Sequence, residues 1–339
     1  MMLAVWLFAS LLLATACPFA IAQNYDPPTA DAVSILNTTV ENQDILHTQV
    51  TVLTADGHTI VHNVSEQQPA DFVVQPRFKR SGIDIYSIKL LIVLVDSIGL
   101  LARQSFNATF SRWEWPGTDR VSVHMTSSKS LTSAGFQTKT MMWSLRSLVQ
   151  FFEIQHRYAE VSFISGYANQ PSLGGGHLTY TPPGPQNISS STDVSDDSTA
   201  NDDFITADDF KNIAMEPVYK PADLLELIMS LLIDVAEQGP DVLLGAISVY
   251  NNRADLSLIV GATSRPADPM PYKSLVIALL DLASKLPLLD PTYQWRQTHF
   301  LIRNNRVIVG KGVFVKGGPP GLESFLKEAD VTAAPVSKF

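Results

Sequence analysis

The stretch 83–103, IDIYSIKLLIVLVDSIGLLAR, decides how the fold of this 339-residue chain is interpreted. Its apolar residues recur with helical spacing, and Lys89 and Asp96 interrupt the run. A bilayer span needs about 20 consecutive apolar residues, which this run does not supply. The stretch therefore predicts a buried amphipathic helix with Asp96 on its solvent side.

Outward from this helix, the same order of elements occurs twice. In the first half, the helix is followed by strand candidates at 106–113 and 120–126, a helix at 138–156, and strands at 159–167 and 176–181. In the second half, the order is a helix at 221–237, strands at 242–250 and 255–262, a helix at 271–285, and strands at 297–303 and 306–315.

Short matches support a duplication of this pattern. VLVDSI (93–98) aligns with LLIDVA (231–236), and RSLV (146–149) aligns with KSLV (273–276), in a repeat of roughly 130 residues. A chance resemblance between two halves of one α+β protein remains the alternative. Because the strands come in pairs, antiparallel sheets are favoured. The sequence thus predicts an α+β fold of two tandem degenerate αββαββ units, with helices packed on antiparallel sheets.

The length favours two domains, and composition shifts suggest their limits. Residues 47–64 predict an extra N-terminal β-hairpin turning at Asp56-Gly57, which we expect to extend the first sheet. Residues 65–80 predict a loop. The expected organisation is a signal peptide at 1–22, an N-terminal unit at 23–181, an acidic Pro/Ser/Asp-rich linker at 182–210, a C-terminal unit at 211–330 and a tail at 331–339.

The N-terminus indicates secretion. MMLAVWLFASLLLATACPFAIAQ is apolar and ends in Ala20-Ile21-Ala22, which predicts cleavage after Ala22. A membrane anchor and a lipoprotein modified at Cys17 are the alternatives. Cys17 is the single cysteine, so the mature chain would lack disulfides, thiolate catalysis and cysteine-based zinc sites.

Four N-x-S/T sequons support an extracellular glycoprotein with no membrane span after signal cleavage. They are Asn37, Asn63, Asn107 and Asn187.

Charge and motifs exclude several function classes. The net charge of -9 offers no concentrated basic patch, which argues against a nucleic-acid partner. The sequence lacks the usual hydrolase, metalloprotease, P-loop and dinucleotide motifs, so we expect no cofactor. His58 and His62, about 13 Å apart on one strand, are too distant to bind one ion, and no metal site is expected.

Trp113-Glu114-Trp115 is the candidate ligand-binding feature. Both indoles would share one strand face beside a carboxylate at a hairpin tip, a platform that suits sugar rings. The alternative is that both indoles cap the first core.

Arg77-Phe78-Lys79-Arg80 is a candidate processing site in the predicted loop. Cleavage after Arg80 would release the hairpin segment as a pro-peptide. An ordinary basic surface is the alternative.

Two classes of function follow. The first is a secreted, non-catalytic binding or structural module whose partner is a glycan or an extracellular protein; ligand and oligomeric state stay open. The second is a secreted carboxylate-dependent hydrolase, in which Asp96 and Asp234 at matching repeat positions, or Glu114, would supply acid and base. Carboxylates sharing a cleft would favour the hydrolase, and outward-facing ones would exclude it.

Overall fold

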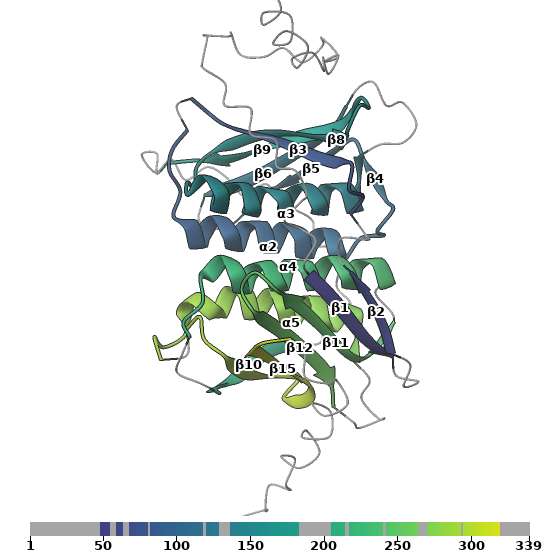
Figure 1. The fold of residues 1–339 in the computed structure, drawn as a ribbon, viewed down its shortest axis with the longest axis vertical. Helices are drawn as coiled ribbons and strands as arrows, with labels where there is room; N and C mark the ends of the chain where they lie inside the picture. The colour runs from purple at the N-terminus through teal and green to yellow at the C-terminus, as the bar shows by residue number, and fades with distance from the viewer. Residues whose placement is uncertain are drawn as a thin grey trace, which may run out of the picture.

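The computed structural model is a four-layer stack in which two outer sheets enclose two pairs of helices (Figure 1). It describes residues 48–54, 59–63, 68–80, 82–117, 120–128, 136–182, 205–213, 217–239, 242–263, 270–292 and 294–318. The elements in chain order are β1 (Thr48–Thr54), β2 (Thr59–Asn63), β3 (Phe72–Phe78), α2 (Ser87–Ala102), β4 (Thr109–Phe110), β5 (Arg112–Trp115), β6 (Val121–Ser127), β7 (Phe136–Gln137), α3 (Thr138–Gln155), β8 (Val161–Tyr167), β9 (Ser172–Tyr180), β10 (Ile205–Asn212), α4 (Pro221–Gln238), β11 (Leu243–Asn251), β12 (Leu256–Ala262), β13 (Met270–Pro271), α5 (Tyr272–Lys285), the 3-10 turn η2 (Leu286–Leu288), β14 (Thr298–Asn304) and β15 (Val307–Lys316). Helices packed on antiparallel sheets confirm the predicted α+β class.

The first sheet has the antiparallel order β3-β8-β9-β6-β5, and α2 and α3 lie against its inner face. Burial alternates along its strands. In β6, Val121 and Val123 are buried whereas Ser122 and His124 are partly exposed. This alternation is typical of a sheet with one face on the core and the other in water.

The second sheet contains the order β10-β14-β15-β12-β11, to which β1 and β2 are added. Pairing β3 with β10, β5 with β11, β6 with β12, β8 with β14 and β9 with β15 gives the same strand order in both sheets. The helices correspond as well. The interval from the start of α2 at Ser87 to the start of α4 at Pro221 equals the interval from the start of α3 at Thr138 to the start of α5 at Tyr272. Two copies of one ancestral unit would produce this correspondence, and duplication itself stays a prediction.

The residues at which the helices begin show that the alignment predicted from short sequence matches between the two halves is out of register. When the starts of α2 and α4 are superimposed, Asp96 matches Ser230, and Asp234 lies four positions further along α4. The two aspartates are therefore one helical turn out of register. Arg146 and Lys273 are likewise out of register, by two turns.

Besides the two-residue strands β7 and β13, each unit contains one longer strand that the sequence did not predict. β3 lies within the expected loop 65–80, and β10 begins inside the expected linker 182–210. Both are edge strands, where proline and charged residues are tolerated. Pro76 in β3 and Asp208-Asp209 in β10 concealed these strands, because such residues are depleted in strands generally.

The expectation that the N-terminal hairpin extends the first sheet is wrong. β1 pairs with β11 in antiparallel register, from Thr48 opposite Asn251 to Val52 opposite Ile247, so the hairpin extends the second sheet. β11 offers a nine-residue edge, whereas β5 at one edge of the first sheet has four residues and β3 at the other carries Pro76. A long edge satisfies more backbone groups of an added strand.

The two units share one continuous hydrophobic core, formed where the helix pairs face each other. α2 and α4 pack directly, and Gly99 of α2 lies so close to Leu280 of α5 that a Cβ atom there would overlap the leucine side chain. Within the ranges given above, no helix combines the length and the apolar character needed to cross a bilayer.

Candidate functional site

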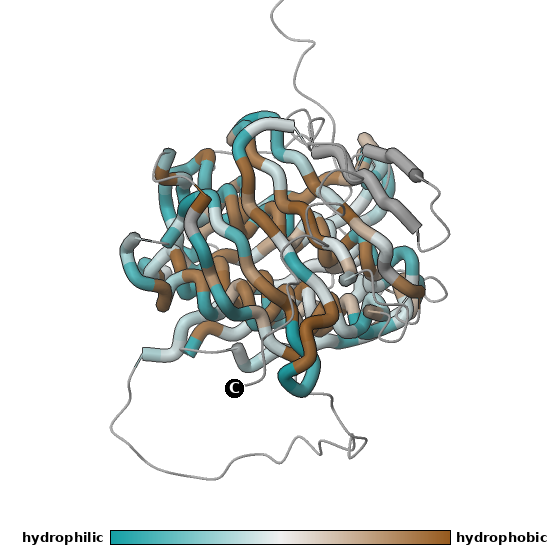
Figure 2. The backbone as a smooth tube through the Cα atoms, turned by 90° about the horizontal axis from the view of Figure 1, so that it is seen from below, coloured by the Kyte–Doolittle hydropathy of each residue, from teal (hydrophilic) through white to brown (hydrophobic). Residues whose placement is uncertain are grey.

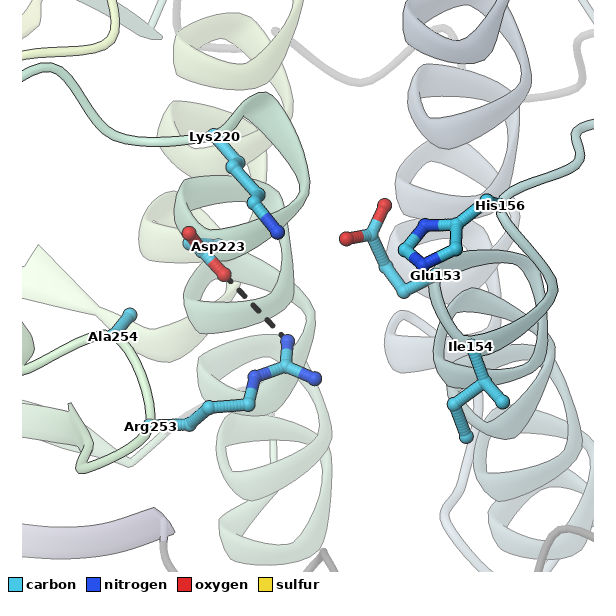
Figure 3. Close-up of a pocket in the computed structure, with 7 residues that line it drawn as sticks. All are labelled: Glu153, Ile154, His156, Lys220, Asp223, Arg253 and Ala254. Atoms are coloured by element: carbon cyan, nitrogen blue, oxygen red, sulfur yellow. Dashed lines mark ion pairs between the residues drawn. The ribbon is translucent and has the colours of Figure 1, made fainter.

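A charged cleft lies between the C-terminal end of α3 and the N-terminal end of α4, and thus between the two units (Figure 3). Its volume is about 350 Å³. Its lining residues are Glu153, Ile154, His156, Lys220, Asp223, Arg253 and Ala254.

The turn between β11 and β12 positions Arg253. The Asn251 side chain accepts hydrogen bonds from the backbone amides of Arg253 and Ala254, at 3.0 and 3.3 Å, and so fixes the turn. The Arg253 guanidinium then lies 3.1 Å from Glu226 and 3.5 Å from Asp223, which are one turn apart on α4. One arginine thereby connects the β11–β12 turn to the first turns of α4.

Glu226 connects this cluster to the other unit. Its side chain is 7% exposed and accepts hydrogen bonds from Asn251 at 3.4 Å and from Gln150 of α3 at 3.5 Å. Its negative charge also raises the pKa of Arg146, although burial keeps that pKa below its usual value. Arg146 is 1% exposed. A buried charge needs such compensation, so Glu226 is part of the interface between α3 and α4.

Glu153 forms the opposite wall. It extends from α3 toward α4, where Lys220 and Asp223 face it (Figure 3). The Tyr158 hydroxyl donates to its carboxylate. Burial, and then this hydrogen bond, raise the pKa of Tyr158 well above its usual value, so the phenol stays protonated. Glu153 is thereby held in place across the cleft from α4.

The carboxyl of Asp223, in the cleft, has a pKa above its usual value. Burial raises its pKa most, Arg253 opposes the shift, and the charges of Glu226 and Glu153 add to it. The cleft therefore combines a carboxyl with a raised pKa, a second carboxylate and fixed cations. Such a set can bind a ligand that carries both signs of charge, or exchange a proton with it.

Trp113 and Trp115 do not form a platform with Glu114. Both indoles are partly buried and pack against the core, whereas Glu114 points outward from the opposite face of β5. Glu114 instead pairs with Arg112 and lies 3.1 Å from His124 Nδ1. The structure thus separates the aromatic and acidic parts of the predicted site.

The outward face of the first sheet carries a polar row around Glu114. His124 Nε2 lies 3.2 Å from the Ser122 hydroxyl, and His124 stacks on His177 at 4.7 Å. The row is open to solvent, and we interpret it as cross-strand polar pairing. Among the described residues, no group of three or more histidine, cysteine, aspartate or glutamate side chains could hold a metal ion.

Of the two aspartates proposed for a hydrolase, Asp234 does not face solvent and Asp96 does so only in part. Asp234 is 0% exposed, and Asp96 is partly buried, which raises its pKa to about 6. The expectation of an outward Asp96 and Asp234 is wrong because α2 and α4 lie in the middle of the stack. Neither aspartate lines the charged cleft.

The expected processing site is only partly in a loop. Arg77 and Phe78 belong to β3, the Phe78 ring lies 4.8 Å from that of Phe151, and Lys79 lies 3.8 Å from Glu160. Arg80 follows in a turn. Cleavage after Arg80 would cut the chain beside a paired strand.

Asn107 is exposed in the turn that follows α2. Asn63 ends β2, in which His62 pairs with Val50, and nothing further is described of these side chains. Ala22, Asn37, His58 and Asn187 lie outside the described residues.

The cleft residues had no sequence signal. Glu153 and Asp223 are distant in the sequence, and Asn251-Asn252-Arg253 has the composition of an ordinary turn. Only the packing of α3 beside α4 brings them together.

Comparisons with known proteins give no family. No protein-family model matches the chain, and no curated protein matches it. Among solved structures, the crystal structure of an oleoyl thioesterase from Lactobacillus plantarum is 11% identical and aligns over 75% of this chain and 99% of its own, at a TM-score of 0.13. That TM-score is too low to support an argument about fold or function.

Proposed function

We propose that the chain is a secreted glycoprotein that binds an extracellular ligand in the charged cleft, without catalysing a reaction. The observation that carries this proposal is the fixed arrangement of charges on the two walls. Tyr158 holds Glu153 on one side, and Asp223 and Glu226 hold Arg253 on the other. Groups already held in place lose little conformational freedom when a ligand binds.

The charges indicate the chemistry of the ligand. Glu153 can pair with a cationic group, while Lys220, at the start of an 18-residue helix, can pair with an anionic one. A peptide end that carries both charges fits this pattern, as does a glycan with an amino and an acidic group. The ligand is thus the charged end of an extracellular peptide or glycan.

Array binding tests this proposal. The secreted protein, deglycosylated and fluorescently labelled, is applied to peptide and glycan arrays together with Glu153→Gln and Lys220→Gln. We expect ligands that lose about tenfold or more of their binding in both variants, the effect of about 1.4 kcal/mol. Asp290→Asn, which removes an exposed charge outside the cleft, should leave binding unchanged. Arrays without any ligand, or ligands indifferent to both cleft variants, would contradict the proposal.

A carboxylate-dependent hydrolase is the second candidate, because Glu153 and Asp223 line one cleft. Asp223, with its raised pKa, would act as the acid and Glu153 as the base. Chromogenic glycosides and esters test this between about pH 4 and pH 8. Turnover that Asp223→Asn abolishes would establish a hydrolase and replace the binding proposal; no turnover above the buffer rate would exclude hydrolysis of those substrates.

A further inference from the structure

The polar row on the outward face of the first sheet contains three side chains in a specific order. Glu114 of β5 lies opposite His124 of β6, and Ser122 precedes His124 by two residues on the same face of β6. Glu114 Oε1 lies 3.1 Å from His124 Nδ1, and His124 Nε2 lies 3.2 Å from the Ser122 hydroxyl oxygen. The carboxylate, the imidazole and the hydroxyl are thus connected through both nitrogens of one ring.

The charge of Glu114 determines which nitrogen of the ring carries the proton. Hydrogen bonds from Arg112 and then from His124 hold the pKa of Glu114 below its usual value, so this carboxyl is ionised. An ionised carboxylate can only accept a hydrogen bond, so the neutral ring of His124 donates from Nδ1 and accepts at Nε2. The Ser122 hydroxyl can therefore donate its proton to Nε2.

Two side chains of β9 hold this arrangement in place. His177 lies opposite His124, and the two rings stack with 4.7 Å between their centroids. Burial and then the charge of His124 lower the pKa of His177, so His177 adds no positive charge here at neutral pH. The Thr179 hydroxyl lies 2.7 Å from the Ser122 hydroxyl oxygen and can donate to it while Ser122 donates to His124. The ring of His124 is therefore held between Glu114 and Ser122.

The second sheet has only part of this set at the matching positions. The residues that correspond to Ser122, His124 and Glu114 are, in this order, Ser257, Ile259 and Ser248. Ser257 is buried and donates to the Gly317 carbonyl at 2.7 Å. Figure 2, which looks at the molecule from the side of this sheet, shows long apolar segments along the backbone. At these positions the second unit thus keeps the hydroxyl and lacks the imidazole and the carboxylate.

We propose that Ser122 is an activated nucleophile that accepts an acyl group from a carboxylic ester, with His124 as its general base. Glu114 is a positioning residue that orients the ring of His124 and stabilises the imidazolium. This reactivity is additional to ligand binding, because the set lies on the outward face of the first sheet and not in the charged cleft. The His124 side chain is 31% exposed, so a small ester can reach it from solvent.

The acyl transfer balances within this set. The Ser122 oxygen attacks the carbonyl carbon of the ester while its proton passes to His124 Nε2. The carbonyl oxygen then carries a negative charge, and the Thr179 hydroxyl, 2.7 Å from the attacking oxygen, can donate to it. The bond between the carbonyl carbon and the alcohol oxygen breaks as His124 returns the proton to that oxygen. The products are an acyl-Ser122 ester and the alcohol.

An activated ester tests the site, because a single hydroxyl donor stabilises the negative oxygen less than a pair of backbone amides does. The full secreted chain is treated with p-nitrophenyl acetate at neutral pH and quenched in acid, and the acetylated residues are mapped by mass spectrometry. We expect acetylation of Ser122 at least about tenfold faster than that of Ser162, an exposed serine of β8 on the same face. Equal acetylation of the two serines, or none on Ser122, would overturn the proposal.

Variants of the base separate its role from the accessibility of Ser122. His124→Ala should slow the acetylation of Ser122 about 100-fold, and imidazole in the buffer should restore part of the rate because it replaces the missing base. A wild-type rate in His124→Ala would overturn the proposal. Thermal melting checks that the variant is folded; if it is not, His124→Gln, tested for the loss of rate alone, replaces it.

A matched pair of variants tests the role of Glu114. Glu114→Gln should slow the acetylation of Ser122 about tenfold or more, because the amide no longer stabilises the imidazolium. Glu114→Asp keeps the charge and should retain more of the rate than Glu114→Gln. Equal rates in the two variants would overturn the assignment of Glu114 as a positioning residue.

Discussion

Replacing Glu226 by glutamine should strongly destabilise the fold, because this carboxylate compensates positive charge between the units. The substitution keeps the size but leaves one acceptor oxygen where the carboxylate has two, Oε1 accepting from Gln150 at 3.5 Å and Oε2 accepting from Asn251 at 3.4 Å, and it removes the negative charge. The Arg253 guanidinium, which lies 3.1 Å from the Glu226 carboxylate, can be solvated by water because its side chain is 49% exposed. The Arg146 side chain is 1% exposed and cannot reach water.

The size of the effect follows from that difference. The loss is that of a charged hydrogen-bond partner, about 1.5–3 kcal/mol, since the ion pair of Glu226 is with the half-exposed Arg253. This loss corresponds to a fall in Tm of about 3–12 °C for a domain of this size.

Urea unfolding followed by tryptophan fluorescence measures this loss. Glu237→Gln, an exposed carboxylate near the end of the same helix, is the control and should change the free energy of unfolding by no more than about 1 kcal/mol, the range for a surface charge contact. A loss below about 1 kcal/mol in Glu226→Gln would refute the compensating role.

Three further predictions concern stability. The pKa of Asp96 is about 6 in the fold, above its usual 3.8, so the native state binds the proton more tightly and stability falls as pH rises through this interval. Asp96→Asn should therefore be about 2–3 kcal/mol more stable than the wild type above about pH 7 and similar near pH 4, in denaturant titrations across this range; a difference that does not change with pH would exclude this cause. Gly99→Val should cost about 1–3 kcal/mol, because its side chain would overlap Leu280. Gly318→Val is its control, since no atom lies near the added Cβ, and equal losses in Tm would contradict the helix contact. Trp113→Ala should lower the free energy of unfolding by about 2–3 kcal/mol without changing ligand binding, as expected for an indole packed on the core; loss of binding with unchanged stability would restore the platform.

The helices could be predicted from sequence because their apolar periodicity is strong. The run 83–103 corresponds to α2, and 271–285 to α5, with boundaries within a few residues. Paired strands after each helix gave the antiparallel class correctly. Edge strands were missed because Pro76 and Asp208 contradict strand propensity, which an edge position tolerates.

The partner of the hairpin and the cleft could not be predicted, since both depend on contacts between distant segments. No local sequence pattern indicates that β1 pairs with the longer edge strand β11 and not with β5. Asp223 gives no signal in the sequence, because an acidic residue in the first turn of a helix is common. Asp96 and Asp234 were expected in water because their repeat alignment suggested a shared polar face, whereas the facing helix pairs bury them wholly or in part.

The N-terminal strands connect the two outer sheets. β1 and β2 belong to the second sheet, whereas β3, which follows β2 closely in the chain, belongs to the first sheet (Figure 1). One short segment of the chain therefore contributes strands to both outer sheets of the stack. Proteolysis after Arg80 would break a covalent bond but leave a fragment attached to both sheets by backbone pairing. The nicked molecule should keep the mass of the intact chain in native electrophoresis and separate into two pieces only in denaturant. For the same reason neither unit is a removable module: cutting the chain between them would produce two fragments that need each other to stay folded.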